Sequence, residues 1–305
     1  MGDLADVLRE RFPVGVRYMA GAALLFSLMS LLVKVVGQRV PTMEVVFSRS
    51  VITLVITAGL VRSKGLDMWG APSSRGLLVA RGVLGFSAVA CFFYALSHLP
   101  LAEATVIQYT NPVWTAIIAA LFLSEHLKLV EIVGVAASLA GVVLVARPEI
   151  LFGGATAGLD PLAVGIALSG SVLSASAYVT IRSLGSDEHP YVIIFYFALI
   201  GTVGSTALLP VTADLVWPTG EEWLAMLGVG LTAQAAQIFL TLGLQHERAG
   251  RAMAVGYLQI VLAAIWGLVF FAEFPDPLGL VGIAMILSGT FVVARRRHVE
   301  PAEVE

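Results

Sequence analysis

Two stretches of the sequence decide the fold: HLPLAEATVIQYTNPVWTAIIAALFLSEHLKLVEIVGVAASLAGVVLVAR (His98–Arg147) and HERAGRAMAVGYLQIVLAAIWGLVFFAEFPDPLGLVGIAMILSGTFVVAR (His246–Arg295). A shift of 148 positions places one on the other without a gap. Apolar matches mean little in so hydrophobic a chain, but polar residues and glycines also keep register: His98 with His246, Tyr109 with Tyr257, Glu125 with Glu273, Gly134 with Gly282 and Gly141 with Gly289. The chain is therefore a tandem duplication.

The composition is that of a membrane protein. Hydrophobic residues make up 58% of the chain and charged residues only 13%, whereas a soluble domain is about a quarter charged. Lys and Arg (18) do not outnumber Asp and Glu (21), so nothing suggests a nucleic-acid partner. The single cysteine, Cys91, excludes a disulfide framework and a cysteine-rich metal site. The charged start, Met1–Arg17, does not have the pattern of a signal peptide.

Ten stretches are long and apolar enough to cross a hydrocarbon core of about 30 Å. They are 17–36, 44–62, 76–97, 101–123, 128–146, 160–183, 190–210, 220–244, 249–272 and 276–294. Five fall in each copy, so we predict an all-α integral membrane protein with repeats at 17–147 and 160–295. Because five is odd, the second copy enters the lipid bilayer the opposite way up, which gives two inverted five-helix repeats.

Basic residues outside the spans or close to their ends predict the orientation. With the N-terminus inside the cell, 13 of them lie on the inner side: Arg9, Arg11, Arg17, Arg62, Lys64, Arg75, Lys128, Arg182, Arg248, Arg251, Arg295, Arg296 and Arg297. Three lie outside: Lys34, Arg39 and Arg147. The positive-inside rule therefore predicts a multi-pass protein of the inner (plasma) membrane with both termini in the cytoplasm.

Several short motifs resemble those of a known transporter superfamily. Leu99–Ala104 (LPLAEA), Asn111-Pro112 and Ser124-Glu125, together with the ten-helix duplication, resemble the drug/metabolite transporter superfamily, EamA type. Phe47–Arg49 (FSR) and Ala146–Phe152 (ARPEILF) are similar to solute carriers related to nucleotide-sugar transporters. The resemblance covers nearly the whole chain. It implies transport of small metabolites, with export the more frequent direction and amino-acid-like solutes the typical cargo.

The span 101–123 carries a cluster of polar residues around a proline. Pro112 removes a backbone hydrogen bond and can open the helix, so we expect a gating role for it. Gln108, Tyr109 and Asn111 surround this point and are candidates for substrate binding. The alternative is hydrogen bonding between helices, since polar side chains commonly join membrane helices.

The span 249–272 presents Tyr257 and Gln259 at matching positions, so they are substrate-binding candidates too. Transporter sites lie at the interface of the repeats, which favours a shared cavity near the midplane. Ile260 stands where the first copy has its proline, so the sequence does not by itself predict an equal kink in this span.

One face of the span 220–244 and its continuation is rich in amides: Gln234, Gln237, Thr241 and Gln245. The 148-residue shift places these on Phe86, Val89, Phe93 and Ser97. We therefore predict that Gln234, Gln237 and Phe93 line a cavity with an amide side and an apolar side, suited to an amphipathic solute. A polar seam against a neighbouring helix is the alternative, most of all for Gln245.

Five further positions stand out because they are polar and lie in or near the spans. Tyr178 is a substrate-binding candidate, and Lys34 and Arg182, which match in the repeats, could gate opposite sides or extend toward lipid head groups. Arg49 and Arg81 lie within spans and could each bind an anionic group. Either could instead pair structurally, for example Arg49 with Glu44.

Glu125 and Glu273 end matching helices, where the helix dipole opposes an acid, so we expect each to be tied to a loop backbone or a basic side chain. Proton binding is the alternative. Ala137 with Gly141, and Ala284 with Ser288, have a spacing that lets membrane helices pack closely. No two histidines have metal-ligand spacing, and neither a metal nor a cofactor is expected.

These observations favour a transporter for a small-molecule solute. We expect alternating access for an amphipathic, amino-acid-like metabolite, with exchange or import of an anionic metabolite as the alternative. Acids occur only near the ends of the spans, so we expect a facilitator or exchanger rather than a proton-driven pump. A membrane enzyme such as an acyltransferase would need a nucleophile beside a base, which the spans do not offer. A non-transporting sensor is a third class, which solute flux would distinguish.

Overall fold

A computed structural model describes residues 12–99, 101–125, 128–152, 159–212, 215–272 and 274–295. The regular elements in this part of the chain are helices. The first repeat contains α2 (Val14–Val36), α3 (Thr42–Ser63), α4 (Arg75–His98), α5 (Leu101–Gln108), α6 (Asn111–Leu123) and α7 (Leu129–Ala146). After the short α8 (Glu149–Phe152), the second contains α9 (Pro161–Leu184), α10 (Pro190–Thr212), α11 (Gly220–His246), α12 (Ala249–Val255), α13 (Leu258–Phe271) and α14 (Pro277–Arg295).

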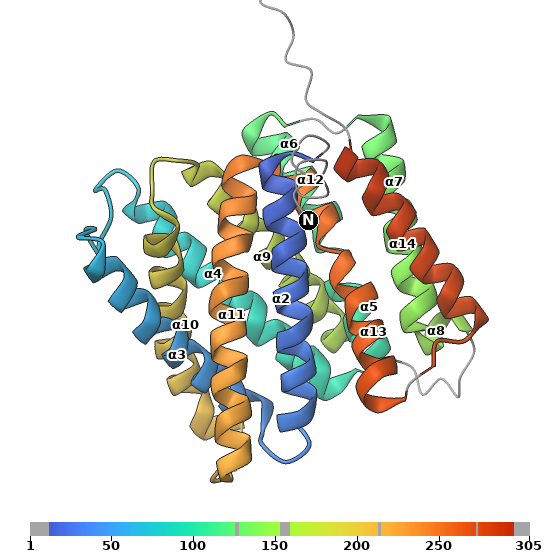
Figure 1. Ribbon diagram of the computed structural model, residues 1–305, viewed down its shortest axis with the longest axis horizontal. Coiled ribbons are helices and arrows are strands. Elements are labelled where there is room, and N and C mark those ends of the chain that lie inside the picture. Colours follow the sequence, from blue (N-terminus) through green and yellow to red (C-terminus); the bar gives the residue numbers. More distant parts are fainter. Residues whose placement is uncertain are drawn as a thin grey trace, which may run out of the picture.

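Ten candidate membrane spans follow from these helices, as the sequence predicted. Two spans are built from two helices each: α5 with α6, and α12 with α13. The chain begins α2 and ends α14 at the same face of the bundle, at the top of Figure 1. We call this the terminal face and the other the opposite face. The even number of spans requires this arrangement.

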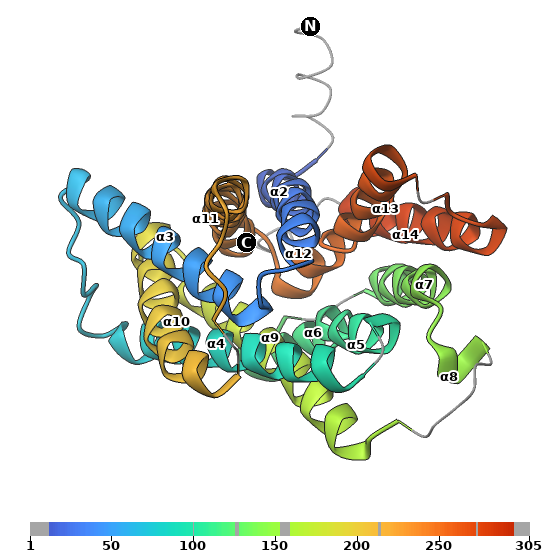
Figure 2. The same ribbon diagram turned by 90° about the horizontal axis from the view of Figure 1, so that it is seen from below.

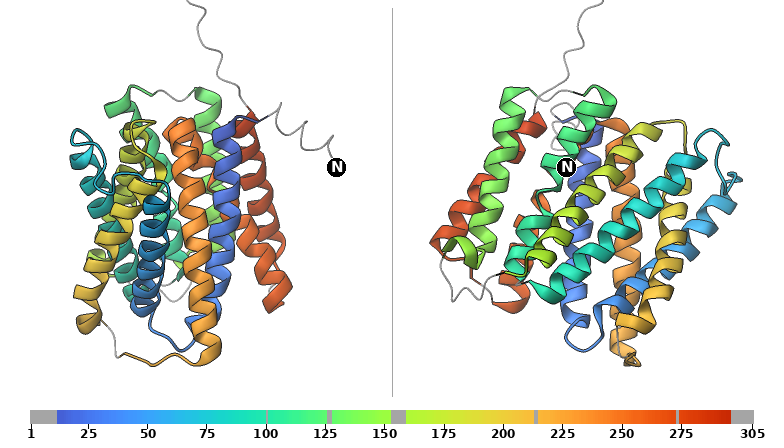
Figure 3. Two further views of the ribbon diagram at one scale, coloured as in Figure 1. Left: turned by 60° about the vertical axis from the view of Figure 1, so that its left-hand side comes forward. Right: turned by 180° about the vertical axis from the view of Figure 1, so that it is seen from behind.

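The helices pack in pairs, and each main pair contains one helix from each repeat. The first helix of each repeat lies against the third helix of the other, α2 on α11 and α9 on α4. The second helices pair with each other (α3 with α10), as do the fifth (α7 with α14), and α6 contacts α12. Figure 2, an end-on view, shows α3 and α10 at one end of the bundle and α7 and α14 at the other. Figure 3 shows α4 and α9 crossing the rear of the molecule. This reciprocal pairing is what a duplication with an approximate two-fold axis produces.

Glycines set the close approach of α7 and α14. A Cβ at Gly141 would lie 2.5 Å from the carbonyl oxygen of Gly282, and one at Gly134 would lie 2.9 Å from that of Gly289. These four residues are the glycines that keep register in the repeat. Of the second predicted packing pair, Ala284 and Ser288 are both exposed. The prediction was wrong there because the helix turns its glycine face, not that spacing, toward α7.

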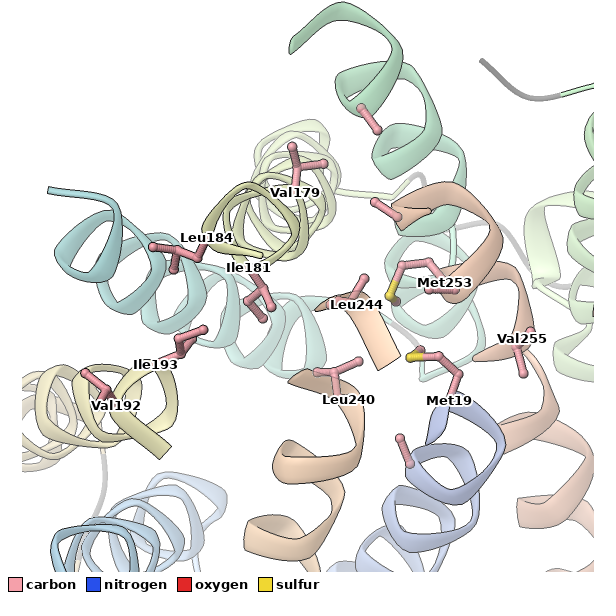
Figure 4. Packing of buried hydrophobic residues seen from close by; sticks show 14 of the residues in the cluster. Met19, Val179, Ile181, Leu184, Val192, Ile193, Leu240, Leu244, Met253 and Val255 are labelled. Carbon is pink, nitrogen blue, oxygen red and sulfur yellow. The ribbon is translucent and has the colours of Figure 1, made fainter. Parts of the chain in front are cut away.

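An apolar cluster joins the two repeats near the terminal face. Figure 4 shows its side chains: Met19 of α2, Val179, Ile181 and Leu184 of α9, Val192 and Ile193 of α10, Leu240 and Leu244 of α11, and Met253 and Val255 of α12. Ile181 and Leu244 are both completely buried. The ends of these helices are therefore held together on this side of the molecule.

Candidate functional site

Two spans are interrupted at the same point of the repeat. The first breaks between Gln108 and Asn111, with Pro112 in the first turn of α6, as predicted. The second breaks between Val255 and Leu258, although Ile260 replaces the proline there. The position of the break is thus shared by the copies, while its local chemical cause differs.

Tighter turns bridge each break. In the first, the Thr110 N–H donates to the carbonyl of Ile107, and that of Val113 to the carbonyl of Thr110. In the second, four bonds reach back only three residues, and their N–H donors are Gly256, Tyr257, Gln259 and Ile260. Such 3₁₀-type bonds satisfy groups that an α-helix would leave without partners. Gly256 favours the second break, because glycine is the weakest ordinary helix former, by about 1 kcal/mol relative to alanine.

A cavity of about 210 Å³ lies among the helices of both repeats. It is lined by side chains of α2, α3, α4, α5, α9, α10 and α11: Phe26, Met29, Arg49, Arg81, Ala88, Val89, Phe92, Gln108, Ser174, Ala177, Tyr178, Phe197 and Gln237, with Gly85. Five predicted substrate-binding residues meet here: Arg49, Arg81, Gln108, Tyr178 and Gln237. Val89 and Gln237, which correspond in the repeat, both line it, so the predicted apolar and amide sides are both present.

Arg81 is the most buried charged residue of this cavity, with 3% of its surface exposed. Its Nη2 donates to Gln237 Oε1 over 3.4 Å, and its guanidinium carbon lies 4.3 Å from the centre of the Phe197 ring. The Phe197 ring and the hydrogen bond to Gln237 hold the guanidinium in place, but neither partner carries a negative charge that would neutralise it.

The remaining polar groups of the cavity come from α3, α5 and α9. Arg49 Nη1 contacts Met29 Sδ at 3.8 Å, and Gln108 Nε2 donates to Ser174 Oγ over 3.2 Å. Glu44, the partner that the sequence offered to Arg49, instead accepts from the backbone N–H of Val216. The cavity therefore presents cations, amides and hydroxyls between aromatic and aliphatic walls.

Other predicted residues do not line this cavity. Tyr109 and Tyr257 stack on each other at the breaks, with ring centroids 6.2 Å apart. Asn111 and Pro112 are buried at the start of α6. Gln234 accepts a hydrogen bond from Thr57 Oγ1 over 3.0 Å, which is the interhelical alternative that we considered.

Phe93 and Gln259 also lie outside it. Gln259 is partly buried in α13, and Phe93 lines a separate hollow of about 720 Å³ between α3, α4, α9 and α10. The face of α4 that meets the central cavity runs through Arg81, Gly85, Ala88 and Phe92, at helical spacing. Phe92 is therefore the aromatic residue of this face of α4, and sequence reasoning missed it, as it missed Phe26 and Phe197. The spacing from Arg81 was the signal that could have found it.

An ion pair links helix ends at the terminal face. The chain turns after α6 at Ser124, whose φ of 55° is left-handed. This turn places Glu125 Oε1 2.7 Å from Arg182 Nε, and Glu125 Oε2 accepts from the N–H of Ala249 over 2.9 Å. Arg182 Nη1 also donates to the Gln245 carbonyl over 2.9 Å. The predicted tie for Glu125 is confirmed, and it joins α6 of the first repeat to α9, α11 and α12 of the second. Glu273 lies outside the described residues.

Different charged contacts occur at the opposite face. Lys34 Nζ lies 4.2 Å from the centre of the Phe271 ring. Arg39 pairs with Glu222, and Arg147 pairs with Asp276. The backbone N–H of Gly279, together with Arg147, holds the pKa of the Asp276 carboxyl below its usual value. These contacts link neighbouring helix ends outside the central cavity.

A larger hollow, of about 750 Å³, lies between α3, α10 and α11 and is lined mostly by apolar residues such as Phe47, Leu215 and Trp223. It lies toward the end of the bundle that α3 and α10 form (Figure 2). In the described part of the chain, no cluster of three or more metal-ligating side chains is found. Cations, amides and hydroxyls thus meet in the smaller central cavity, whereas the lining of this larger hollow is mostly apolar.

Comparison with known proteins explains the doubled architecture. The model of the EamA-like transporter family matches this chain twice, over residues 13–147 and 161–295. The chain belongs to the EamA-like transporter family. EamA-like relatives include the pseudopaline exporter CntI of Pseudomonas aeruginosa, 32% identical over 90% of this chain and 94% of the relative. Another is human solute carrier family 35 member G1, 30% identical over 95% of this chain and 81% of the relative.

A solved crystal structure of another protein has the same EamA-like fold. It matches with a TM-score of 0.78 over 92% of this chain and 97% of the other, at 22% identity, which bears on the fold alone. Together, the ten spans, the two family units and the transporter relatives identify a multi-pass membrane transporter. Its family is one of transporters and not of enzymes, so a small-molecule solute is implied.

Proposed function

We propose that this protein exports a small amphipathic metabolite from the cytoplasm by alternating access, with the central cavity as its binding site. The observation that carries the proposal is a cavity lined by both repeats. The Arg182–Glu125 tie and the apolar cluster, both near the terminal face, support closure of the cavity toward that side. Inverted-repeat transporters place their substrate at such an interface and rock one repeat against the other. The similarity to an exporter supports the outward direction.

We further propose that the terminal face is cytoplasmic, since 13 of the 18 basic residues fall on that side in the sequence-based topology. The structure then corresponds to the conformation closed toward the cytoplasm. Facilitated diffusion or exchange is the simplest coupling, because the cavity lining contains no acidic side chain.

Flux measurements on purified protein in liposomes test this function. We would load vesicles with a defined mixture of amino acids and small carboxylic acids and follow the release of each by mass spectrometry. We expect selective release of a few solutes, reduced several-fold in Gln108→Ala and Gln237→Ala, since one hydrogen bond to a solute contributes about 0.5–1.5 kcal/mol. Peripheral Gln38→Ala is the matched control, because Gln38 is exposed at the opposite face. If every solute left these vesicles no faster than it leaves solute-loaded vesicles without protein, transport of these classes of solute would be contradicted.

The two arginines favour a second candidate, exchange or import of an anionic metabolite. Counterflow separates it from export. If labelled solute enters only when unlabelled solute is present inside the vesicles, exchange is favoured. If solute leaves the vesicles into a buffer that contains no solute, a facilitator is favoured.

A further inference from the structure

Arg81 is a buried cation with unused hydrogen-bonding capacity toward the cavity. A guanidinium group carries five N–H donors and stays charged at every physiological pH. The single hydrogen bond of Arg81, to Gln237, is 3.4 Å long, and its Nε has no hydrogen-bond partner among the described residues. Such a group lacks the compensation that buried charges in proteins normally have.

Arg49 is in a similar situation on the neighbouring helix. Its hydrogen-bond contact is the sulfur of Met29 at 3.8 Å, and sulfur is a weak acceptor. Within the described part of the chain, the ion pairs involve other arginines, namely Arg39, Arg147, Arg182 and Arg251. The cavity therefore holds two positive charges that no described carboxylate balances.

The two arginines enter the cavity from opposite halves of the membrane. Arg49 lies about 10 Å along α3 from Thr42 at the opposite face, at 1.5 Å per residue. Arg81 lies about 9 Å along α4 from Arg75 at the terminal face. Apolar side chains, including Phe26 and Phe92, line the cavity with them. The positive charges are thus offset along the transport path, as two ends of one solute would require.

We propose that the transported solute carries two anionic groups on a short carbon chain, one bound by Arg49 and the other by Arg81. This inference rests on the proposed function and gives the class of its substrate. Guanidinium binds carboxylate through paired, charge-assisted hydrogen bonds. A volume of about 210 Å³ corresponds to about seven water molecules at 30 Å³ each, below the range for drug-sized ligands. A small dicarboxylate fits these limits of charge and size.

Compounds matched in length test the charge requirement. Succinate, glutarate and adipate would each be compared with their monoamide and diamide, which replace carboxylates by neutral groups of the same shape. Ligand binding raises the melting temperature, so titration of the full-length protein at pH 7.5 gives each Kd. We expect the best dicarboxylate to bind at least about fivefold more tightly than its monoamide, since a charge-assisted hydrogen bond is stronger than a neutral one. Glycerol 3-phosphate, whose charges share one group, should bind less tightly than the best dicarboxylate.

Substitutions assign each anionic group to its arginine. Arg49→Gln and Arg81→Gln should each reduce the dicarboxylate-to-monoamide preference to about one. Arg49→Lys and Arg81→Lys keep the charge and should retain most of it, which separates loss of charge from loss of folding. Arg39→Gln, at the opposite face and paired with Glu222, is the matched control and should leave the preference unchanged.

Equal Kd values for dicarboxylate, monoamide and diamide would overturn the inference, as would tighter binding of glycerol 3-phosphate. Flux of zwitterionic amino acids or of solutes with a single anionic group, without dicarboxylate preference, would overturn it while leaving the proposed transport function intact. Absence of flux for every solute would instead contradict the proposed function. The two failures are therefore distinguishable.

Discussion

The hydroxyl of Tyr257 donates a hydrogen bond, 3.0 Å long, to the carbonyl oxygen of Tyr109, its counterpart 148 residues earlier. That carbonyl is released by the break between α5 and α6, because the N–H of Val113 turns to the carbonyl of Thr110 instead. One repeat thus satisfies a backbone group that the other exposes. In an inverted-repeat transporter, the alternate conformation exchanges the roles of the repeats, so Tyr109 should there donate to the carbonyl of Tyr257.

The tyrosine pair therefore predicts opposite effects from two equivalent substitutions. Tyr257→Phe should shift the population away from the present conformation and Tyr109→Phe toward it, each by roughly two- to tenfold for a bond worth about 0.5–1.5 kcal/mol. Labelling of Ser174→Cys in a Cys91→Ser background, from each side of the membrane, reports the two populations. In the double variant, Tyr109→Phe with Tyr257→Phe, the populations of the two conformations should be near those of the wild type. Shifts of the same sign in both single variants would contradict the exchange.

The Arg182–Glu125 tie predicts a gate at the terminal face. Glu125→Gln should open this face, because it removes one charge of a pair whose side chains are 29% and 14% exposed. We expect a loss of roughly 1–3 kcal/mol for the closed conformation, between the values of exposed and fully buried pairs. We would measure the rate at which a cavity cysteine is labelled from the terminal side, and we expect this rate to increase in Glu125→Gln. Asp276→Asn, which breaks an exposed pair at the opposite face, is the control and should not accelerate it.

Close packing of α7 and α14 predicts strong sensitivity at their shared glycines. Gly141→Ala should lower the free energy of unfolding by about 1–3 kcal/mol, because its Cβ would lie 2.5 Å from the carbonyl oxygen of Gly282. Gly59→Ala is the matched helical control. A Cβ there meets no described atom within 4 Å, so its melting temperature should stay equal or rise slightly. Equal loss in both variants would show that the close contact between α7 and α14 is not the cause of the effect.

The proposed orientation predicts side-specific labelling. In a Cys91→Ser background, Gln38→Cys should react with an impermeant maleimide on intact cells, while Ser63→Cys should react only after permeabilisation. Both positions are exposed, at opposite ends of the bundle. Reaction of Ser63→Cys on intact cells, with Gln38→Cys protected, would reverse the proposed orientation and with it the direction of transport.

Hydrophobic length and repetition alone determined most of the architecture. Every backbone group in lipid must be satisfied within a helix or barrel, so ten long apolar stretches left little freedom for another fold. The 148-residue register identified the duplication, and its odd helix number made the repeats inverted. Pro112 also predicted the first break, because its missing N–H acts within one turn of the chain.

Tertiary structure decided which polar residues meet, because the rotation of each helix depends on its neighbours. The sequence spacing placed Gln234 and Gln237 on one face of α11. In the structure, Gln234 accepts a hydrogen bond from Thr57 of α3, whereas Gln237 lines the cavity. The second break lacks a proline and is accompanied instead by Gly256 and by the Tyr257–Tyr109 bond across the repeats. Arg49 and Arg81 lie in one cavity because α3 and α4 both pack on α10. The sequence determined the helices, and contacts between them determined the site.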